Sequence, residues 1–222
     1  MLKPRHTLDS LGEVGIDEAG RGCLWGPLMA AAVVWPDEST WTEDMRSVSE
    51  KIKDSKKLSV KLRCSLEVKI KEYALGWGVG IVSAKEIDSL GMTRSNRLAF
   101  QRALEGIKVP FGRILIDGIL GIPGHDGVQQ IIEPKGDATY LAIAAASILA
   151  KEGRDRIVKE LCATDPLLES RYSIEKSKGY GTAKHREAIK THGMHDEHRR
   201  LFLRKLLGLE HTISIGSLFI ED

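Results

Sequence analysis

The chain has 222 residues, of which 42% are hydrophobic and 29% charged, and this composition is typical of a soluble globular protein with one good core. A net charge of only +2 excludes a strong overall attraction to polyanions, so nucleic-acid binding would have to come from local patches. Three scattered cysteines argue against a disulfide framework, and the apolar runs are shorter than the roughly 20 residues of a membrane span. Because the start, "MLKPRHTLDS", lacks an apolar signal core, we expect a cytoplasmic protein.

The first third of the chain predicts two strands, a loop, a helix and a third strand. A buried strand ends at Asp17, and the run of small and β-branched residues over 28–35 follows a glycine-rich turn, which favours an antiparallel partner. The polar stretch 36–47 is expected to be a mobile excursion, although it has the composition of a helix start. Apolar residues repeat at helical spacing over 61–73, and "GWGVGIVS" predicts a strand that ends at Ser83.

The following elements alternate between helices and short apolar strands. Residues 83–106 predict two helical pieces, with Gly91 as the break and Thr93 as the cap of the second. "RILIDG" and "QQIIEPK" are short continuous apolar strands, and residues 138–161 predict one long helix rich in alanine. This order, with an opening hairpin, predicts an α/β domain with a mixed sheet, although several doubly wound folds share the alternation. From Arg171 onward the sequence is basic and helical, which indicates a C-terminal arm.

Four acidic residues follow strands or lie at strand-to-helix turns. Asp17 and Glu18 end the first strand, Asp117 ends "RILID", and Asp137 lies in "EPKGDAT". We expect these side chains at the carboxyl edge of the sheet, where loops and helix N-termini meet. Carboxylates so close together repel unless a multivalent cation neutralises them, and oxygen ligands select Mg²⁺ or Mn²⁺ over zinc. The pattern predicts a metal-dependent phosphoryl-transfer site.

Each acid taken alone also has a simpler explanation. An Asp at a strand-to-turn junction commonly accepts hydrogen bonds from local backbone N–H groups, and this would fit Asp117 before Gly118. Asp137 could equally cap the following helix. The adjacent pair of Asp17 and Glu18 is harder to explain in this way, because caps do not come as charged doublets beside a buried strand.

Six sequence blocks, in order, resemble the ribonuclease HII family, the type 2 ribonucleases H. The blocks are "DEAGRG" at 17–22, "DSKKL" at 54–58, "IDG" at 116–118, "KGDA" at 135–138, "AAASILAKEGRDR" at 144–156 and "KGYGT" at 178–182. The resemblance implies a ribonuclease H-like fold, in which helices flank a mixed five-stranded sheet and a helical C-terminal arm follows. Arg21 and the short N-terminus favour HII over the related ribonuclease HIII, which carries an extra N-terminal domain and typically Lys in the first block.

The resemblance also implies an activity. Family members are endonucleases that cleave the RNA strand of RNA–DNA hybrids and incise duplex DNA 5′ of embedded ribonucleotides, leaving a 3′-hydroxyl and a 5′-phosphate. By motif position, the family's metal-binding carboxylates fall on Asp17, Glu18, Asp117 and Asp137, and we expect Asp17 to bridge two Mg²⁺ or Mn²⁺ ions. Two ions roughly 3.5–4 Å apart can hold both the attacking and the leaving oxygen of an in-line displacement at phosphorus.

The blocks also contain residues suited to sensing the ribose. The 2′-hydroxyl is the only group that separates ribose from deoxyribose at a given position, and the glycines of the Gly20-Arg21-Gly22 loop let backbone groups approach it. Tyr180 matches the family position whose ring packs against the sugar after the ribonucleotide. Without the ordered blocks, a tight turn and a hydrophobic plug between core and arm would be the simpler interpretations.

Further candidates lie near these blocks. Lys56 is expected to bind a substrate phosphate, although a solvated lysine at a capped helix start has the same pattern. Weaker candidates are Lys57, Ser147, Lys151, Lys178 and His185. His185 is a candidate proton shuttle, but a His beside a basic helix more often contacts phosphate or makes a structural hydrogen bond.

We expect a catalytic core over 12–165 and a basic substrate-binding arm over 166–207. Between residues 171 and 205 the arm carries ten Lys and Arg against four Asp and Glu. Such a run is often only a solvated face, but next to an anionic substrate it favours backbone binding with a steep salt dependence.

The tail, 208–222, carries Ile215, Leu218 and Phe219 at spacings similar to those of sliding-clamp-binding peptides, which several family members carry at a terminus. Thr212 stands where such peptides have Gln, and one of the two usual aromatic residues is replaced by leucine. A docked or frayed chain end is the alternative interpretation.

Two other functions stay open at this point. A hybrid-binding module that has lost catalysis would not need all four carboxylates, and a DNA nuclease or resolvase of the same fold would not need "GRG" or "KGYGT". The expected partners are RNA–DNA hybrids and ribonucleotide-containing duplex DNA, with no membrane, and the expected state is a monomer.

Overall fold

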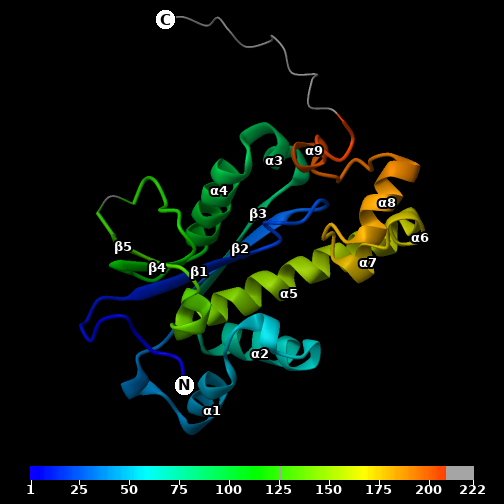
Figure 1. Cartoon of the computed structure of the whole chain (residues 1–222). Helices are drawn as coiled ribbons and strands as arrows, with labels where there is room; N and C mark the ends of the chain where they lie inside the picture. The colour runs from blue at the N-terminus through cyan, green and yellow to red at the C-terminus, as the bar shows by residue number, and fades with distance from the viewer. Residues whose placement is uncertain (126, 209–222) are drawn as a thin grey trace, which may run out of the picture.

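A five-stranded mixed sheet with the order β3-β2-β1-β4-β5 forms the centre of the molecule in the computed structural model, which describes residues 1–125 and 127–208 (Figure 1). β1 (Glu13–Ala19), β2 (Leu28–Val34) and β3 (Gly76–Val82) are joined as an antiparallel meander. β4 (Arg113–Asp117) pairs parallel to β1, and β5 (Gln129–Glu133) pairs parallel to β4. The predicted α/β class and mixed five-stranded sheet are therefore confirmed.

Helices cover both faces of this sheet (Figure 1). α4 (Met92–Glu105) packs on one face, preceded by the short α3 (Ala84–Leu90). It approaches β3 so closely that a Cβ at Gly78 or Gly80 would overlap helix backbone atoms. The small residues of β3 therefore set the distance between this helix and the sheet.

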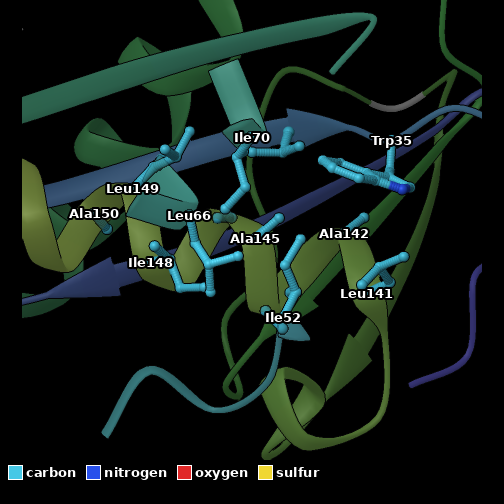
Figure 2. Packing of buried hydrophobic residues seen from close by; sticks show 14 of the residues in the cluster. Trp35, Ile52, Leu66, Ile70, Leu141, Ala142, Ala145, Ile148, Leu149 and Ala150 are labelled. Carbon is cyan, nitrogen blue, oxygen red and sulfur yellow. The ribbon is translucent and has the colours of Figure 1, made fainter. Parts of the chain in front are cut away.

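α5 (Leu141–Thr164) crosses the opposite face, and α2 (Val60–Tyr73) packs on its outer side (Figure 1). Figure 2 shows how alanines of α5 meet larger apolar side chains such as Ile52, Leu66 and Ile70. β1 has a glycine, Gly15, where a Cβ would overlap the α5 backbone. This close contact fixes the start of α5 against the strand that carries the first two acids.

The C-terminal helices gather at the far end of α5 (Figure 1). They are α6 (Pro166–Tyr172), α7 (Ile174–Ser177), α8 (Ala183–His192) and α9 (Arg200–Leu203). Their buried side chains share one apolar cluster with Leu24 and Trp25, which lie in the loop between β1 and β2. The arm is therefore packed directly against the loop that follows the acidic strand end.

Three local predictions are wrong in detail. The polar stretch 36–47 is not simply an excursion, because it contains a 3-10 helix (Glu38–Thr40) and the start of α1 (Glu43–Lys51). Thr93 lies inside α4, whose N-cap is Gly91 with φ 75°. α5 begins three residues later than predicted, because a separate 3-10 helix occupies Gly136–Ala138. None of the helices in the described ranges is long and apolar enough to cross a membrane.

Candidate active site

The acids meet where β1 and β4 end. Residue Ile16 of β1 pairs with Ile116 of the parallel strand β4, so the next residues, Asp17 and Asp117, lie side by side; Asp117 ends β4, whereas β1 continues to Ala19. Asp137 comes from the 3-10 helix that precedes α5. One carboxylate oxygen from each of these three aspartates lies within 4.8 Å of the others. The topology thus gathers residues 120 positions apart into one cluster.

The cluster is buried, and its charges repel one another. Burial, followed by the charges of Glu18 and Asp117, raises the pKa of Asp17 well above its usual range. Burial and the charges of Asp117 and Asp54 likewise raise the pKa of Asp137. A divalent cation would relieve this repulsion, and an all-oxygen ligand set suits Mg²⁺ or Mn²⁺. The residues present therefore fit the predicted metal.

Local hydrogen bonds orient the acids. The Glu18 N–H donates to Asp17 Oδ1 over 2.7 Å, and the Gly136 N–H donates to Asp117 Oδ1 over 2.9 Å. Asp117 thus accepts a backbone hydrogen bond, as its simpler explanation required, and also belongs to the acidic cluster. Asp137 does not cap α5, because the N-cap of that helix is Tyr140.

Glu18 lies differently from the other three acids. It is outside the three-aspartate cluster found in the described residues, and its Oε1 is 3.9 Å from Arg21 Nη1. Burial raises the pKa of Glu18, while Arg21 and the amide of Asn96 lower it. The structure therefore brings together three of the four predicted metal ligands, and the role of Glu18 stays a prediction.

A pocket of about 230 Å³ opens beside the acids. It is lined by Asp17, Glu18, Ala19, Gly20, Arg21, Gly22, Ser55, Lys56, Asp117, Ser147, Lys151 and Tyr180. The pocket combines the acidic strand ends, the glycine loop, a lysine from the "DSKKL" block and an aromatic ring from the arm. Catalytic and ribose-sensing candidates therefore share one cavity.

Three of the weaker candidates lie away from this lining. Lys57 is 70% exposed and its Nζ is 3.7 Å from Asp54. Lys178 has φ 51° and is not among the described residues that line the pocket, while its carbonyl accepts from Arg154. His185 is fully buried, with Nδ1 2.9 Å from the Tyr180 carbonyl and Nε2 2.9 Å from His198 Nε2. Their predicted substrate roles have no support in these contacts.

Ser147 and Lys151, both on α5, do reach the pocket. Ser147 Oγ is 3.0 Å from Ser55 Oγ, which ties the "DSKKL" block to the helix beneath the acids. Lys151 Nζ donates to both oxygens of Asp155 over 2.6 and 2.7 Å. Lys151 is thus partly neutralised by its own helix, whereas Lys56 lines the pocket with no ion pair in the described residues.

Sequence reasoning missed several buried polar residues around the pocket. Asn96 is 2% exposed, and its side-chain amide lies close enough to Glu18 to lower the pKa of that carboxyl. Arg63 is buried on α2 and donates to the Leu58 carbonyl over 2.8 Å, which supports the loop that carries Lys56. Both residues lie in amphipathic helices, where a polar side chain is normally predicted to be exposed to solvent. Only spatial contacts identify them.

Comparisons with known proteins agree with this geometry. The ribonuclease HII family model matches residues 14–205. The chain is 45% identical over 190 residues to a ribonuclease HII of Parabacteroides distasonis, covering 86% of this chain and 89% of the relative. It is 41% identical over 202 residues to a ribonuclease HII of Porphyromonas gingivalis, covering 91% and 94%.

Solved structures give the same result. The ribonuclease H2 of Pyrococcus horikoshii superposes with a TM-score of 0.70 at 29% identity, covering 91% of this chain and all of that one. The ribonuclease HII of Archaeoglobus fulgidus, solved in complex with PCNA, gives 0.67 at 26% identity and covers 90% and 98%. The chain therefore belongs to the ribonuclease HII family, endoribonucleases that act on RNA–DNA hybrids and on ribonucleotides embedded in duplex DNA.

Proposed function

We propose that the aspartate cluster of Asp17, Asp117 and Asp137 holds two divalent cations, Mg²⁺ or Mn²⁺, with Glu18 as a further ligand. The single observation that carries this proposal is the meeting of three carboxylate oxygens within 4.8 Å, beside the pocket that Asp17 and Asp117 line. Bound cations of this kind supply Lewis-acid activation of a water and stabilisation of the leaving oxygen. The buried, mutually repelling acids provide the negative charge that such ions need.

The remaining pocket residues are proposed to bind and orient the nucleic acid. The Gly20-Arg21-Gly22 loop begins three residues after Asp17, so a ribose held by this loop has its phosphate next to the cluster. The ring of Tyr180, 43% exposed, also lines the pocket and is suited to pack against the next sugar. Lys56 supplies a positive charge for a phosphate, and the arm supplies further cations for the backbone.

The decisive experiment is a nicking assay on duplex DNA with one embedded ribonucleotide, run beside an all-DNA duplex and an RNA–DNA hybrid with Mg²⁺ or Mn²⁺. We expect a single nick 5′ of the ribonucleotide, with 3′-hydroxyl and 5′-phosphate ends, and cleavage of the hybrid's RNA strand. Asp117→Asn should abolish both activities, whereas Glu50→Gln, an exposed acid on α1, should leave them unchanged. Cleavage of the all-DNA duplex would instead support a DNA nuclease or resolvase, and binding without cleavage would support a silent module.

A sliding clamp is a second proposed partner. Support comes from the archaeal ribonuclease HII that was solved in complex with PCNA. The predicted clamp-binding residues of this chain, Ile215, Leu218 and Phe219, lie outside the described residues. Co-purification with a clamp that is lost in Phe219→Ala would support the proposal, and capture that survives this substitution would refute it.

A further inference from the structure

Two buried arginines lie behind the glycine loop and have no place in the function described so far. Arg154, on α5, is 1% exposed, and Arg199, just before α9, is fully buried. Both guanidinium groups donate to backbone carbonyls rather than to carboxylates. Because a buried cation without an anionic partner is costly, such a pair is expected to serve a purpose beyond packing.

Arg154 joins the chain beyond the glycine loop to the chain before Tyr180. Its Nε donates to the Pro27 carbonyl over 2.9 Å, and its Nη2 donates to the Trp25 carbonyl over 3.2 Å. Its Nη1 donates to the Lys178 carbonyl over 2.8 Å. One rigid guanidinium therefore holds the segment that follows the glycine loop against the segment that precedes Tyr180.

Arg199 acts on the glycine loop itself. Its Nε donates to the Gly26 carbonyl over 2.8 Å, and its Nη1 donates to the Arg21 carbonyl over 3.1 Å. All peptide bonds of the described chain are trans, so the N–H of Gly22 points away from the carbonyl of Arg21 in the same peptide unit. With that carbonyl turned toward the buried Arg199, the Gly22 N–H is left on the opposite side. Within the described residues this N–H has no acceptor, and Gly22 lines the pocket.

Backbone hydrogen bonds extend this connection to the arm. The Leu24 N–H donates to the Gly179 carbonyl over 2.9 Å, next to Tyr180. The Arg199 N–H in turn donates to the Leu24 carbonyl over 2.8 Å. The glycine loop, the tyrosine segment and the start of α9 are thus held as one unit, with the two guanidinium groups inside it.

We propose that Arg154 and Arg199 are positioning residues for ribonucleotide selection. By fixing the Arg21–Gly22 peptide, Arg199 presents the Gly22 N–H to the bound sugar. Arg154 holds the segment that carries Tyr180 next to this loop. Selection of ribose over deoxyribose then depends on the C-terminal arm as well as on the loop. This inference rests on the proposed function, because it takes the pocket to be the site that recognises the ribonucleotide.

The test compares binding to two duplexes that differ by one 2′-hydroxyl. Fluorescence anisotropy gives the Kd for a duplex with one ribonucleotide and for the matched all-DNA duplex, with every protein in an Asp117→Asn background that blocks cleavage. The variants are Arg154→Met, Arg199→Met and Arg199→Lys. The matched control is Arg113→Met, since Arg113 is 3% exposed but pairs with Asp9 and Glu13 at the far end of β4.

We expect Arg154→Met and Arg199→Met to weaken binding of the ribonucleotide duplex about tenfold or more, the effect of losing charge-assisted hydrogen bonds. The Kd for the all-DNA duplex should change less than about twofold, so the ratio of this Kd to the Kd for the ribonucleotide duplex falls toward one. Arg199→Lys retains a buried cation but not the forked donors of the guanidinium, so it should lower this ratio less than Arg199→Met does. Arg113→Met should lower the Tm but leave the ratio as in the parent protein.

Each outcome has a distinct meaning. If the parent protein discriminates and all three variants discriminate equally well, the positioning role is refuted. It is also refuted if Arg113→Met reduces the ratio as much as they do, because the effect would then be general destabilisation. A parent protein that does not discriminate refutes the proposed function instead. If Arg154→Met does not fold, Arg199→Lys decides the question.

Discussion

Replacing Asp17 by asparagine is predicted to stabilise the metal-free protein while abolishing its activity. Asp17 is 7% exposed, and burial together with the charges of Glu18 and Asp117 raises its pKa. A carboxyl group whose pKa is raised by folding destabilises the folded state at pH values above its pKa in the unfolded chain, neutral pH included. Asparagine removes the charge but keeps an oxygen that can accept the Glu18 N–H.

The size of the effect follows from the spacing of the acids. Asp17 and Asp117 have carboxylate oxygens within 4.8 Å of one another. At that separation two unit charges repel by about 1 kcal/mol at the dielectric constant of water and by about 3 kcal/mol at an effective value near 20. We therefore expect Asp17→Asn to raise the free energy of unfolding by about 1–3 kcal/mol. In a chain of this length, each kcal/mol raises the Tm by about 2–4 °C.

The assay is thermal unfolding in EDTA and in millimolar Mg²⁺, at pH 7 and at lower pH. Asp17→Asn should have the higher Tm in EDTA, and its advantage should shrink as the pH falls and Asp17 of the parent protein becomes protonated. Mg²⁺ should raise the Tm of the parent protein more than that of the variant, since binding to the folded state alone stabilises it. Glu50→Gln is the control, with no expected shift. A lower Tm for Asp17→Asn in EDTA would refute the electrostatic reasoning.

Two further predictions concern the pocket loop and the buried histidine pair. A Cβ at Gly22 meets no protein atom within 4 Å, so Gly22→Ala should change the Tm by less than about 2 °C. The same substitution should reduce nicking at a single ribonucleotide about tenfold or more. Unchanged nicking would contradict the role of this loop. Burial is the main reason that the pKa of His198 is lowered to about 3, against about 6.5 in an unfolded chain. Below pH 6.5 the unfolded chain therefore binds a proton that the folded protein does not, so the folded protein loses stability as the pH falls from 6.5 toward 3. Urea unfolding should show the parent protein losing up to about 2 kcal/mol more than His198→Gln between pH 6.5 and 5, and equal losses would count against this assignment.

The end of β4 could be predicted from the sequence because it depends on a local pattern, whereas β1 continues two residues beyond its predicted end at Asp17. A buried apolar run that stops at an acid locates Asp17 and Asp117, and their meeting follows from the parallel pairing of neighbouring strands. The ordered blocks added the family and its fold. Glu18 shows the limit of this reasoning, since adjacent residues of a strand point to opposite faces and need not share one ligand cluster.

Arg154 and Arg199 could not be predicted, because their hydrogen bonds join positions far apart in the sequence. The bond from Arg154 to Pro27 spans 127 residues, and the bond from Arg199 to Arg21 spans 178. No periodicity or spacing predicts such contacts. The block "AAASILAKEGRDR" does contain Arg154, but an arginine in a helix is normally interpreted as a solvent-exposed charge.

One support of the glycine loop, Arg199, lies in the arm and not in the β1–α5 packing beside the acids, which bears on how catalysis and selection can be altered. Asp17 and Asp117 lie on the neighbouring parallel strands β1 and β4. Their positions depend on the packing of β1 on α5, which is so close that even a methyl group at Gly15 would not fit. The glycine loop begins three residues after Asp17, but it is held by guanidinium groups and by the arm. A change in the arm can therefore weaken ribose recognition without moving the carboxylates. Conversely, a change that loosens β1 against α5 should disturb the acids first, because the Arg199 contacts to the loop carbonyls come from the arm, whereas only Arg154 belongs to α5 itself.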